Sequence, residues 1–120
     1  MKVDGIHRQS TFRALRKPDV RSSSGPIRVF YVRSQALCGD EKMQVAYSIG
    51  RSFGKAVVRN KCRRRLRSTV YEIRDGLARG AYLVTVSKSA ADLSYDELAS
   101  HMRKAIRTTS GRAGIREDKR

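Results

Sequence analysis

The stretch GKAVVRNKCRRRLRSTVYEIRDGL, residues 54–77, decides what kind of fold this chain forms. Seven basic residues fall between Lys55 and Arg67, and no acidic residue follows until Glu72. A block of like charge is typical of a disordered tail, because its members repel one another in a compact structure. Apolar side chains are nevertheless threaded between the arginines, so their spacing indicates whether the block is folded.

The apolar residues of this stretch recur at helical spacing. With about 100° of rotation per residue, five of them fall on one side of a helical wheel. They are Val58, Cys62, Leu66, Val70 and Ile73. A stripe of this kind is typical of a helix that packs against a core. The stretch is therefore predicted to be an amphipathic helix whose opposite side carries Asn60, Arg64, Arg67 and Tyr71.

The start of this predicted helix suits a bound phosphate. Gly50 and Gly54 allow the preceding backbone to turn tightly and to approach a ligand closely. Arg59 and Asn60 are expected in the first turn, where free N–H groups and the helix dipole favour an anion. Cations at that end are unfavourable unless an anion is bound, so a phosphate-bearing partner is expected. A solvated basic face without a ligand is the alternative for the helix taken alone.

The composition of the whole chain also favours a polyanionic partner. Its 120 residues, enough for one domain, contain 27 Lys and Arg against 11 Asp and Glu, a formal charge of +16. Such a charge opposes compaction unless a polyanion binds. The longest apolar runs fall far below the roughly 20 residues that span a bilayer, and the N-terminus lacks the apolar core of a secretory signal. We therefore expect a cytoplasmic nucleic-acid-binding protein with no membrane partner.

The cysteines predict neither a metal site nor a disulfide. Cys38 and Cys62 form no CxxC pair, and the chain has only two histidines. A structural zinc site needs four ligands at short paired spacings. Both thiols are expected to be free, with Cys62 buried as a small apolar residue. The acidic residues are scattered, so a nuclease whose own side chains hold a catalytic metal is not expected.

The segments around the basic stretch predict further helices and strands. A short helix is expected in residues 7–17, with Ser10 as its N-cap. A connector rich in Pro, Gly and Ser follows at 18–26, with room for at most one short strand. Runs of β-branched and aromatic residues then predict strands at 27–34, 43–50 and 80–87, with a turn at 38–42.

Alternation within the strands assigns their side chains to two faces. In the first predicted strand, one face is expected to carry Ile27, Val29 and Tyr31. The other face is expected to carry Arg28, Phe30 and Val32. In the second strand, one face is expected to carry Val45, Tyr47 and Ile49.

The C-terminal third of the chain predicts one helix and a tail. Ser94 and Glu97 have capping-box spacing. The helix that they open would align Leu98, Met102, Ala105 and Ile106 on one side. Residues 108–120 show no periodicity and are predicted to be a disordered basic tail, which leaves a single RNA-binding domain at 1–107.

Together these elements predict an α+β fold, a two-layer α/β sandwich with a mixed central sheet. The strand at 43–50, the basic helix and the strand at 80–87 form a βαβ-like unit. The two strands of that unit are expected to run parallel.

Several stretches resemble one known family. SIGRSFGKAVVRNKCRRRLR, residues 48–67, resembles the signature of the bacterial ribonuclease P protein subunit. STFRAL, residues 10–15, is similar to the first helix of that family, and GAYLVTVSKSAADLSYDELASHM, residues 80–102, to its last strand and helix. The resemblance runs in unbroken order from about Ile6 to Ile106.

The resemblance implies a fold, a function and partners. The expected fold is an α/β sandwich with a left-handed crossover around the basic helix. The expected function is that of a protein subunit of ribonuclease P, which removes the 5′ leader of precursor tRNA. The partners implied are a catalytic RNA subunit and precursor tRNA, with no obligate protein partner. Catalysis and the divalent metal, Mg²⁺, are expected on the RNA, with no cofactor on the protein and no activity of the protein alone.

The resemblance also implies binding residues. The basic-helix positions are Arg59, Asn60, Lys61, Arg63, Arg64 and Arg67, preceded in the loop by Arg51 and Lys55. Phe12 and Tyr31 match aromatic residues of a cleft that holds the single-stranded leader, although either could instead be a core residue. Three departures from the family pattern are Lys61 in place of an arginine, Arg51-Ser52 in place of two lysines, and Arg16 in place of an aromatic residue.

A structural RNA binder, such as a ribosomal protein, has the same composition. Basic charge alone does not separate the two classes of protein. The signature from Gly54 to Arg67 favours the ribonuclease P subunit.

Overall fold

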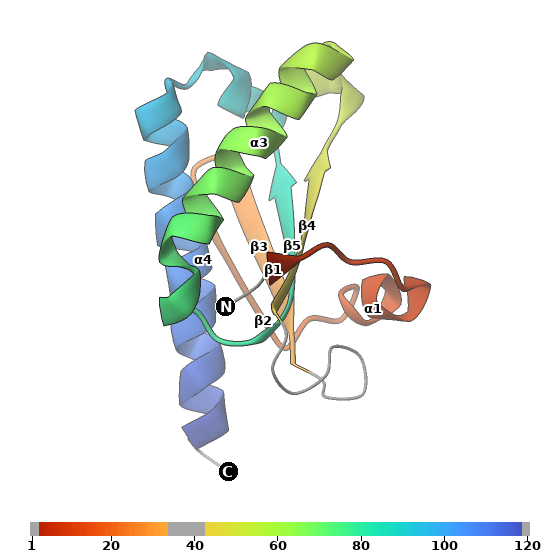
Figure 1. Ribbon diagram of the computed structural model, residues 1–120, viewed down its shortest axis with the longest axis vertical. Coiled ribbons are helices and arrows are strands. Elements are labelled where there is room, and N and C mark those ends of the chain that lie inside the picture. The colour runs from red at the N-terminus through yellow and green to blue at the C-terminus, as the bar shows by residue number, and fades with distance from the viewer. Residues whose placement is uncertain (1–2, 34–42, 119–120) are drawn as a thin grey trace.

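The computed structural model describes residues 3–33 and 43–118, with side chains described as far as residue 113. Figure 1 shows a twisted sheet with two long helices on one side. The strands are β1 (Val3–Asp4), β2 (Val20–Ser24), β3 (Ile27–Val32), β4 (Met43–Ile49) and β5 (Gly80–Val86). The helices are α1 (Gln9–Ala14), α3 (Ala56–Ile73) and α4 (Tyr95–Asp118). Short 3-10 turns are η1 (Arg51–Phe53), η2 (Arg74–Gly76) and η3 (Lys88–Asp92).

The five strands form one mixed sheet in the order β1-β4-β5-β3-β2. β4 pairs with β5 in parallel, as predicted for the βαβ-like unit, with Val45 opposite Tyr82. β3 runs antiparallel to β5 and to β2. β1, which the sequence did not predict, pairs in parallel with β4. The predicted α+β fold with a mixed sheet is confirmed.

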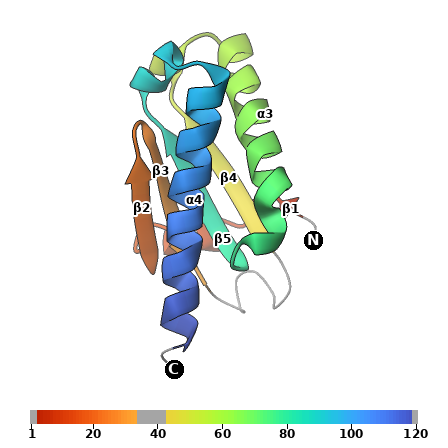
Figure 2. The ribbon, with the colours of Figure 1, turned by 90° about the vertical axis from the view of Figure 1, so that its left-hand side faces the viewer.

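Helices α3 and α4 cover one face of the sheet, and the short α1 lies on the other face (Figures 1 and 2). In Figure 1, α3 lies in front of β4 and β5. Both strands point upward there. The chain passes from β4 through α3 to β5, which lies to the left of β4. The crossover is therefore left-handed, against the usual right-handed preference.

The main core lies between the sheet and the two long helices. It contains Ile27, Val29 and Tyr31 of β3, which confirms the faces expected from alternation. Helix α3 contributes Cys62, Leu66 and Val70, and α4 contributes Leu98, Met102, Ala105 and Ile106. The Cys62 thiol is free, and burial raises its pKa despite the opposing charges of Arg63 and Arg65.

The apolar stripe of α3 is shorter than its periodicity predicted. Val58 is 45% exposed, and Ile73 is only partly buried. The buried part of the stripe therefore runs from Cys62 to Val70. Among the described residues, no helix is both long and apolar enough to cross a membrane.

The segment expected to be a connector contains a complete strand, β2. Its alternation is polar, with Ser22 and Ser24 facing the helices. Ser22 donates to the carbonyl of Ala105 at 2.8 Å, and Ser24 pairs with His101 Nδ1 at 2.8 Å. Because these serines are satisfied by α4, the strand forms with Val20 as its one buried apolar side chain.

The prediction of a disordered tail from residue 108 is wrong as far as residue 118. Helix α4 continues to Asp118, and Thr109, Ser110 and Ala113 are buried. The hydroxyl of Ser110 accepts a hydrogen bond from the Ala78 N–H at 2.6 Å. Polar groups matched across the interface hold this segment, so the predicted domain boundary at 107 is also wrong. Residues 119–120 lie outside the described residues.

Two smaller predictions concern the N-terminal caps of helices α1 and α4. Helix α1 begins after Arg8 without a side-chain cap, so Ser10 is not its N-cap. The capping box of α4 is confirmed, because the Ser94 N–H donates to Glu97 Oε1 at 3.0 Å and the Glu97 N–H donates to Ser94 Oγ at 3.2 Å. The turn predicted at 38–42 and Cys38 lie outside the described residues.

Candidate nucleic-acid interface

The start of helix α3 leaves backbone donors without side-chain caps. Gly54 has φ 155° and ψ −170°, a conformation open in practice only to glycine, and Lys55 at the N-cap makes no side-chain cap. Gly50 has an ordinary φ of −68°, so only one of the two glycines is needed for the turn. The first turn contains no acidic residue. An anion is therefore the natural partner of these N–H groups.

The cations of α3 point away from the core. The residues predicted to point outward, Asn60, Arg64, Arg67 and Tyr71, are exposed. Lys61 is exposed too, and Arg59, Arg63 and Arg65 are half-buried. Arg63 donates to the side-chain oxygen of Asn60 at 2.8 Å. This contact with a neutral group positions the Arg63 guanidinium without cancelling its charge. The helix therefore offers phosphate a dense array of cations.

Tyr47 of β4 lies beneath one of these cations. The guanidinium of Arg67 is 6.0 Å from the centre of the Tyr47 ring, a weak cation–π contact. Burial raises the pKa of the Tyr47 hydroxyl far above its usual value, with Arg67 opposing, so this group stays neutral. The Tyr47 ring therefore lies beside the Arg67 side chain, which remains exposed.

The loop cations continue the same surface. Arg51 lies in η1, Lys55 is the N-cap of α3, and both are exposed. The half-buried Arg59 ends the first turn, and its Nε has no hydrogen-bond partner within the described part of the chain. A phosphate oxygen would satisfy that buried donor. The eight residues predicted for the basic surface thus lie along one continuous segment.

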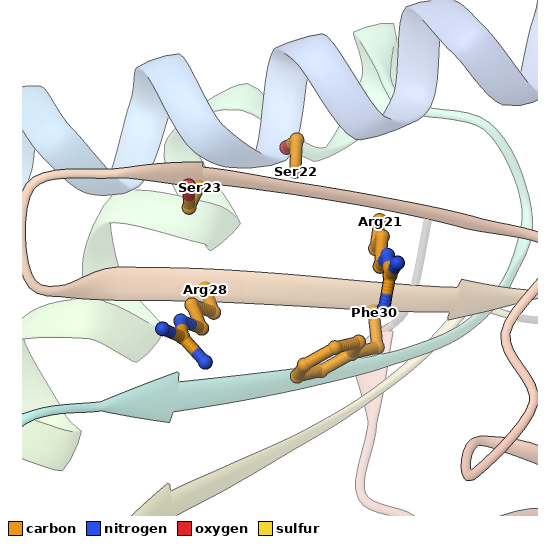
Figure 3. A pocket seen from close by; sticks show the side chains of 5 residues that line it. All are labelled: Arg21, Ser22, Ser23, Arg28 and Phe30. Carbon is orange, nitrogen blue, oxygen red and sulfur yellow. The ribbon is translucent and has the colours of Figure 1, made fainter.

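A second basic surface lies on the α1 side of the sheet. There Phe30 is half-buried against a small cluster that includes Ile6, Leu15 and Val32. A shallow hollow of about 350 Å³ extends from Phe30 along β2 and β3. It is lined by Arg21, Ser22, Ser23, Arg28 and Phe30, and Figure 3 shows their side chains, of which that of Ser22 points toward α4. An aromatic ring flanked by arginines is a common arrangement for single-stranded RNA.

The prediction of Tyr31 as a cleft residue is wrong. Tyr31 is 1% exposed and lies in the main core, on the sheet face that the long helices cover. Its hydroxyl donates to the carbonyl of Arg79, and its ring occupies the space where a Cβ at Gly80 would lie. A ring enclosed in this way offers no face to a nucleobase. Phe12, on α1, is 40% exposed and remains a candidate.

Sequence reasoning missed Phe30 as a site residue although the signal was present. The alternation of β3 placed Phe30 with Arg28, opposite Tyr31, and the structure confirms both faces. Arg21 lies directly across from Phe30 in the β2–β3 register. Arg21 could not be assigned to this face from the sequence, because β2 was not predicted as a complete strand. The aromatic ring of β3 on the α1 side of the sheet is therefore that of Phe30, and Tyr31 lies on the other face.

The chain is similar in sequence to curated proteins named ribonuclease P protein component. It is 40% identical over 73 residues to that of Thermobifida fusca and 37% identical over 73 residues to that of Symbiobacterium thermophilum. Each match covers 60% of this chain, but 50% and 60% of the respective relative. The chain thus matches between half and three-fifths of the length of these relatives.

The fold is similar to solved structures of ribonuclease P proteins. That from Staphylococcus aureus has a TM-score of 0.78 at 16% identity, covering 89% of this chain and 95% of the other. That from Thermotoga maritima has a TM-score of 0.74 at 15% identity, covering 88% and 96%. The family model described as Ribonuclease P matches residues 2–110. Because that match includes most of the 120 residues, the chain belongs to the ribonuclease P protein family.

Proposed function

We propose that this protein binds the catalytic RNA subunit of ribonuclease P and the 5′ leader of precursor tRNA. In doing so it promotes endonucleolytic removal of the leader, which gives the mature 5′ end of the tRNA. The observation that carries the proposal is helix α3, which buries Cys62, Leu66 and Val70 and turns its cations outward. Membership of the family supplies the identity of the RNA.

The basic surface of α3 is assigned to the RNA subunit. A folded RNA presents closely spaced phosphates, and rigid helical cations match them without a large loss of conformational entropy. The surface consists of Arg51, Lys55, Arg59, Asn60, Lys61, Arg63, Arg64 and Arg67. Arg64 and Arg67 are exposed, so their replacement is expected to affect folding little.

The α1 side of the sheet is assigned to the leader. Phe30 and the exposed Phe12 offer rings for stacking, and Arg21 and Arg28 offer charge beside them. This combination holds single strands with little dependence on sequence. Because the two surfaces lie on opposite faces of the sheet, one protein can contact the RNA subunit and the leader at once (Figures 1 and 2).

We place catalysis and the divalent metal on the RNA subunit. The described residues contain no group of three or more His, Cys, Asp or Glu side chains that could hold a metal ion. The protein would therefore contribute binding and positioning, and Mg²⁺ would be held chiefly by RNA. We also propose a cytoplasmic location and no obligate protein partner.

Sequencing the RNA that copurifies with the full chain tests this function. The expected result is one dominant RNA of the ribonuclease P type, together with precursor tRNA that retains its leader. Recovery of ribosomal RNA alone would favour a structural ribosomal role. A mixture without enrichment would indicate a nonspecific polyanion binder.

A further inference from the structure

Apolar side chains are exposed at one end of the most cationic helix of the protein. Val57 is 78% exposed, Val58 is 45% exposed, and Tyr95, at the start of α4, is 40% exposed. Large exposed apolar groups gathered at one place usually mark an interaction site. Here Val57 and Val58 line a hollow of about 380 Å³ between α3, η3 and α4, and Tyr95 contacts Arg65, which lines it too.

The hollow is apolar within and cationic along one edge. Phe53 and Cys62 lie in its buried part, while Val57 and Ala91 line its open part. The cations at its border are Lys61 and Arg65, both from α3. An apolar interior with a few charged groups is the usual composition of a site for a small planar group.

Arg65 makes a cation–π contact with Tyr95 at this border. Its guanidinium carbon lies 5.0 Å from the centre of the Tyr95 ring. Nucleobases that leave a helical stack are commonly held against arginine planes and aromatic rings. The pair therefore supplies a preformed surface on which a base can stack beside the hollow.

The charges around the hollow define where an RNA backbone can lie. The nearby acids Asp92, Asp96 and Glu97 all belong to η3 and α4. Lys61 and Arg65, the cations that line the hollow, belong to α3, so phosphates are favoured on the α3 side and disfavoured on the α4 side. A second copy of this chain, with its charge of +16, is a poor occupant because like charges would meet there.

We propose that this hollow binds one unstacked nucleobase of the RNA subunit, with its flanking phosphates on Lys61 and Arg65. The proposal rests on the proposed function. It adds a contact that recognises the shape of a nucleobase, whereas the basic surface recognises the charge of RNA phosphates. It explains why Val57 stays exposed within a cationic segment: its partner is the RNA. Recognition by an apolar interior favours any extruded base over a paired one.

The test fills the hollow without changing charge. Ala91 is exposed, so Ala91→Phe should fold, and Ser100→Phe on the exposed side of α4 is the matched control. Loss of one stacked base should weaken binding of the RNA subunit by about 5- to 100-fold. The slope of log affinity against log salt should stay unchanged, because no phosphate contact is lost. Ser100→Phe should bind like the wild type.

Two further measurements probe the same hollow through Val57. Val57→Ser removes an exposed side chain, so it should weaken binding in the same way even where Ala91→Phe fails to fold. A photoreactive benzoylphenylalanine at position 57 should crosslink to one nucleotide of the RNA subunit. Wild-type affinity in both variants would overturn the proposal, as would a protein dimer that Ala91→Phe abolishes.

The proposed function and this proposal fail separately. If the wild-type protein does not bind the RNA subunit at all, the proposed function is wrong. If it binds and activates the RNA subunit, and Ala91→Phe and Val57→Ser do so equally well, only the nucleobase site is wrong.

Discussion

The ring of Tyr31 meets the ring of Tyr82 edge-on, with centroids 4.9 Å apart and planes inclined by 60°. Both residues are buried between the sheet and the long helices. Their hydroxyls donate to the carbonyls of Arg79 and Ala78, in the loop that leads into β5. This pair fixes the orientation of β3, and so it directs Phe30 to the opposite face, where RNA can reach it.

Replacement of Tyr31 and Phe30 separates a core role from a binding role. Tyr31→Ala should lower the free energy of unfolding by about 3–5 kcal/mol, because it leaves a large cavity. Phe30→Ala should stay folded and weaken binding of precursor tRNA by about 1–3 kcal/mol. Thermal melts and binding assays check both, with mature tRNA as the control. Equal losses for mature and precursor tRNA would contradict the leader assignment.

RNA binding by helix α3 is expected to depend on its packed apolar stripe as well as on its positive charge. Arg64→Ala and Arg67→Ala should fold, weaken RNA binding and flatten the log–log salt slope by roughly one unit each. Leu66 is fully buried, so Leu66→Arg should largely unfold the domain although it adds a positive charge. Circular dichroism melts and RNA binding check the three variants. Tighter binding by a folded Leu66→Arg protein would contradict the packed helix.

Sequence periodicity predicted the elements whose apolar side chains face one core. The spacing of Cys62, Leu66 and Val70 predicted α3, and alternation predicted both faces of β3. The capping box at Ser94 predicted the start of α4 because that hydrogen-bond exchange is local. These signals arise from neighbouring residues, so one sequence contains them completely.

Contacts distant in the chain could not be predicted in this way. Ser22 pairs with residues 83 and 87 positions away in α4, and that contact stabilises both β2 and the end of the helix. Tyr31 was assigned to a cleft through resemblance, against the alternation that placed it opposite Phe30. The hollow beside Val57 depends on how η3 meets α3, which no local pattern specifies.

The C-terminal half of α4 is expected to contribute to stability. Ser110→Ala leaves the Ala78 N–H without its partner, which should lower the free energy of unfolding by about 1–3 kcal/mol. Thr108→Ala is the matched control, because Thr108 is exposed and bonds only within its own helix. Chemical denaturation checks both variants. Equal stabilities would indicate that residues after 107 do not pack.

The cap of α4 should make stability depend on pH in the acidic range. Hydrogen bonds from the backbone and side chain of Ser94 lower the pKa of Glu97 below its usual value of 4.5. The contribution is therefore present above that value and is lost as the pH falls through the lowered pKa. Between about pH 6 and about pH 3, the wild type should lose more stability than Glu97→Gln. Parallel melting curves for the two proteins would show that the cap contributes nothing.

Reconstitution of the enzyme tests the central claim most directly. The full chain, the RNA subunit transcribed from the same genome and precursor tRNA are combined in the presence of Mg²⁺, and cleavage at the 5′ end of the mature tRNA is measured. The protein alone is predicted to cleave nothing, and its addition to the RNA subunit is predicted to raise the cleavage rate. Cleavage by protein free of RNA, with contaminating nuclease excluded, would contradict the account, and so would an RNA subunit whose rate the protein leaves unchanged.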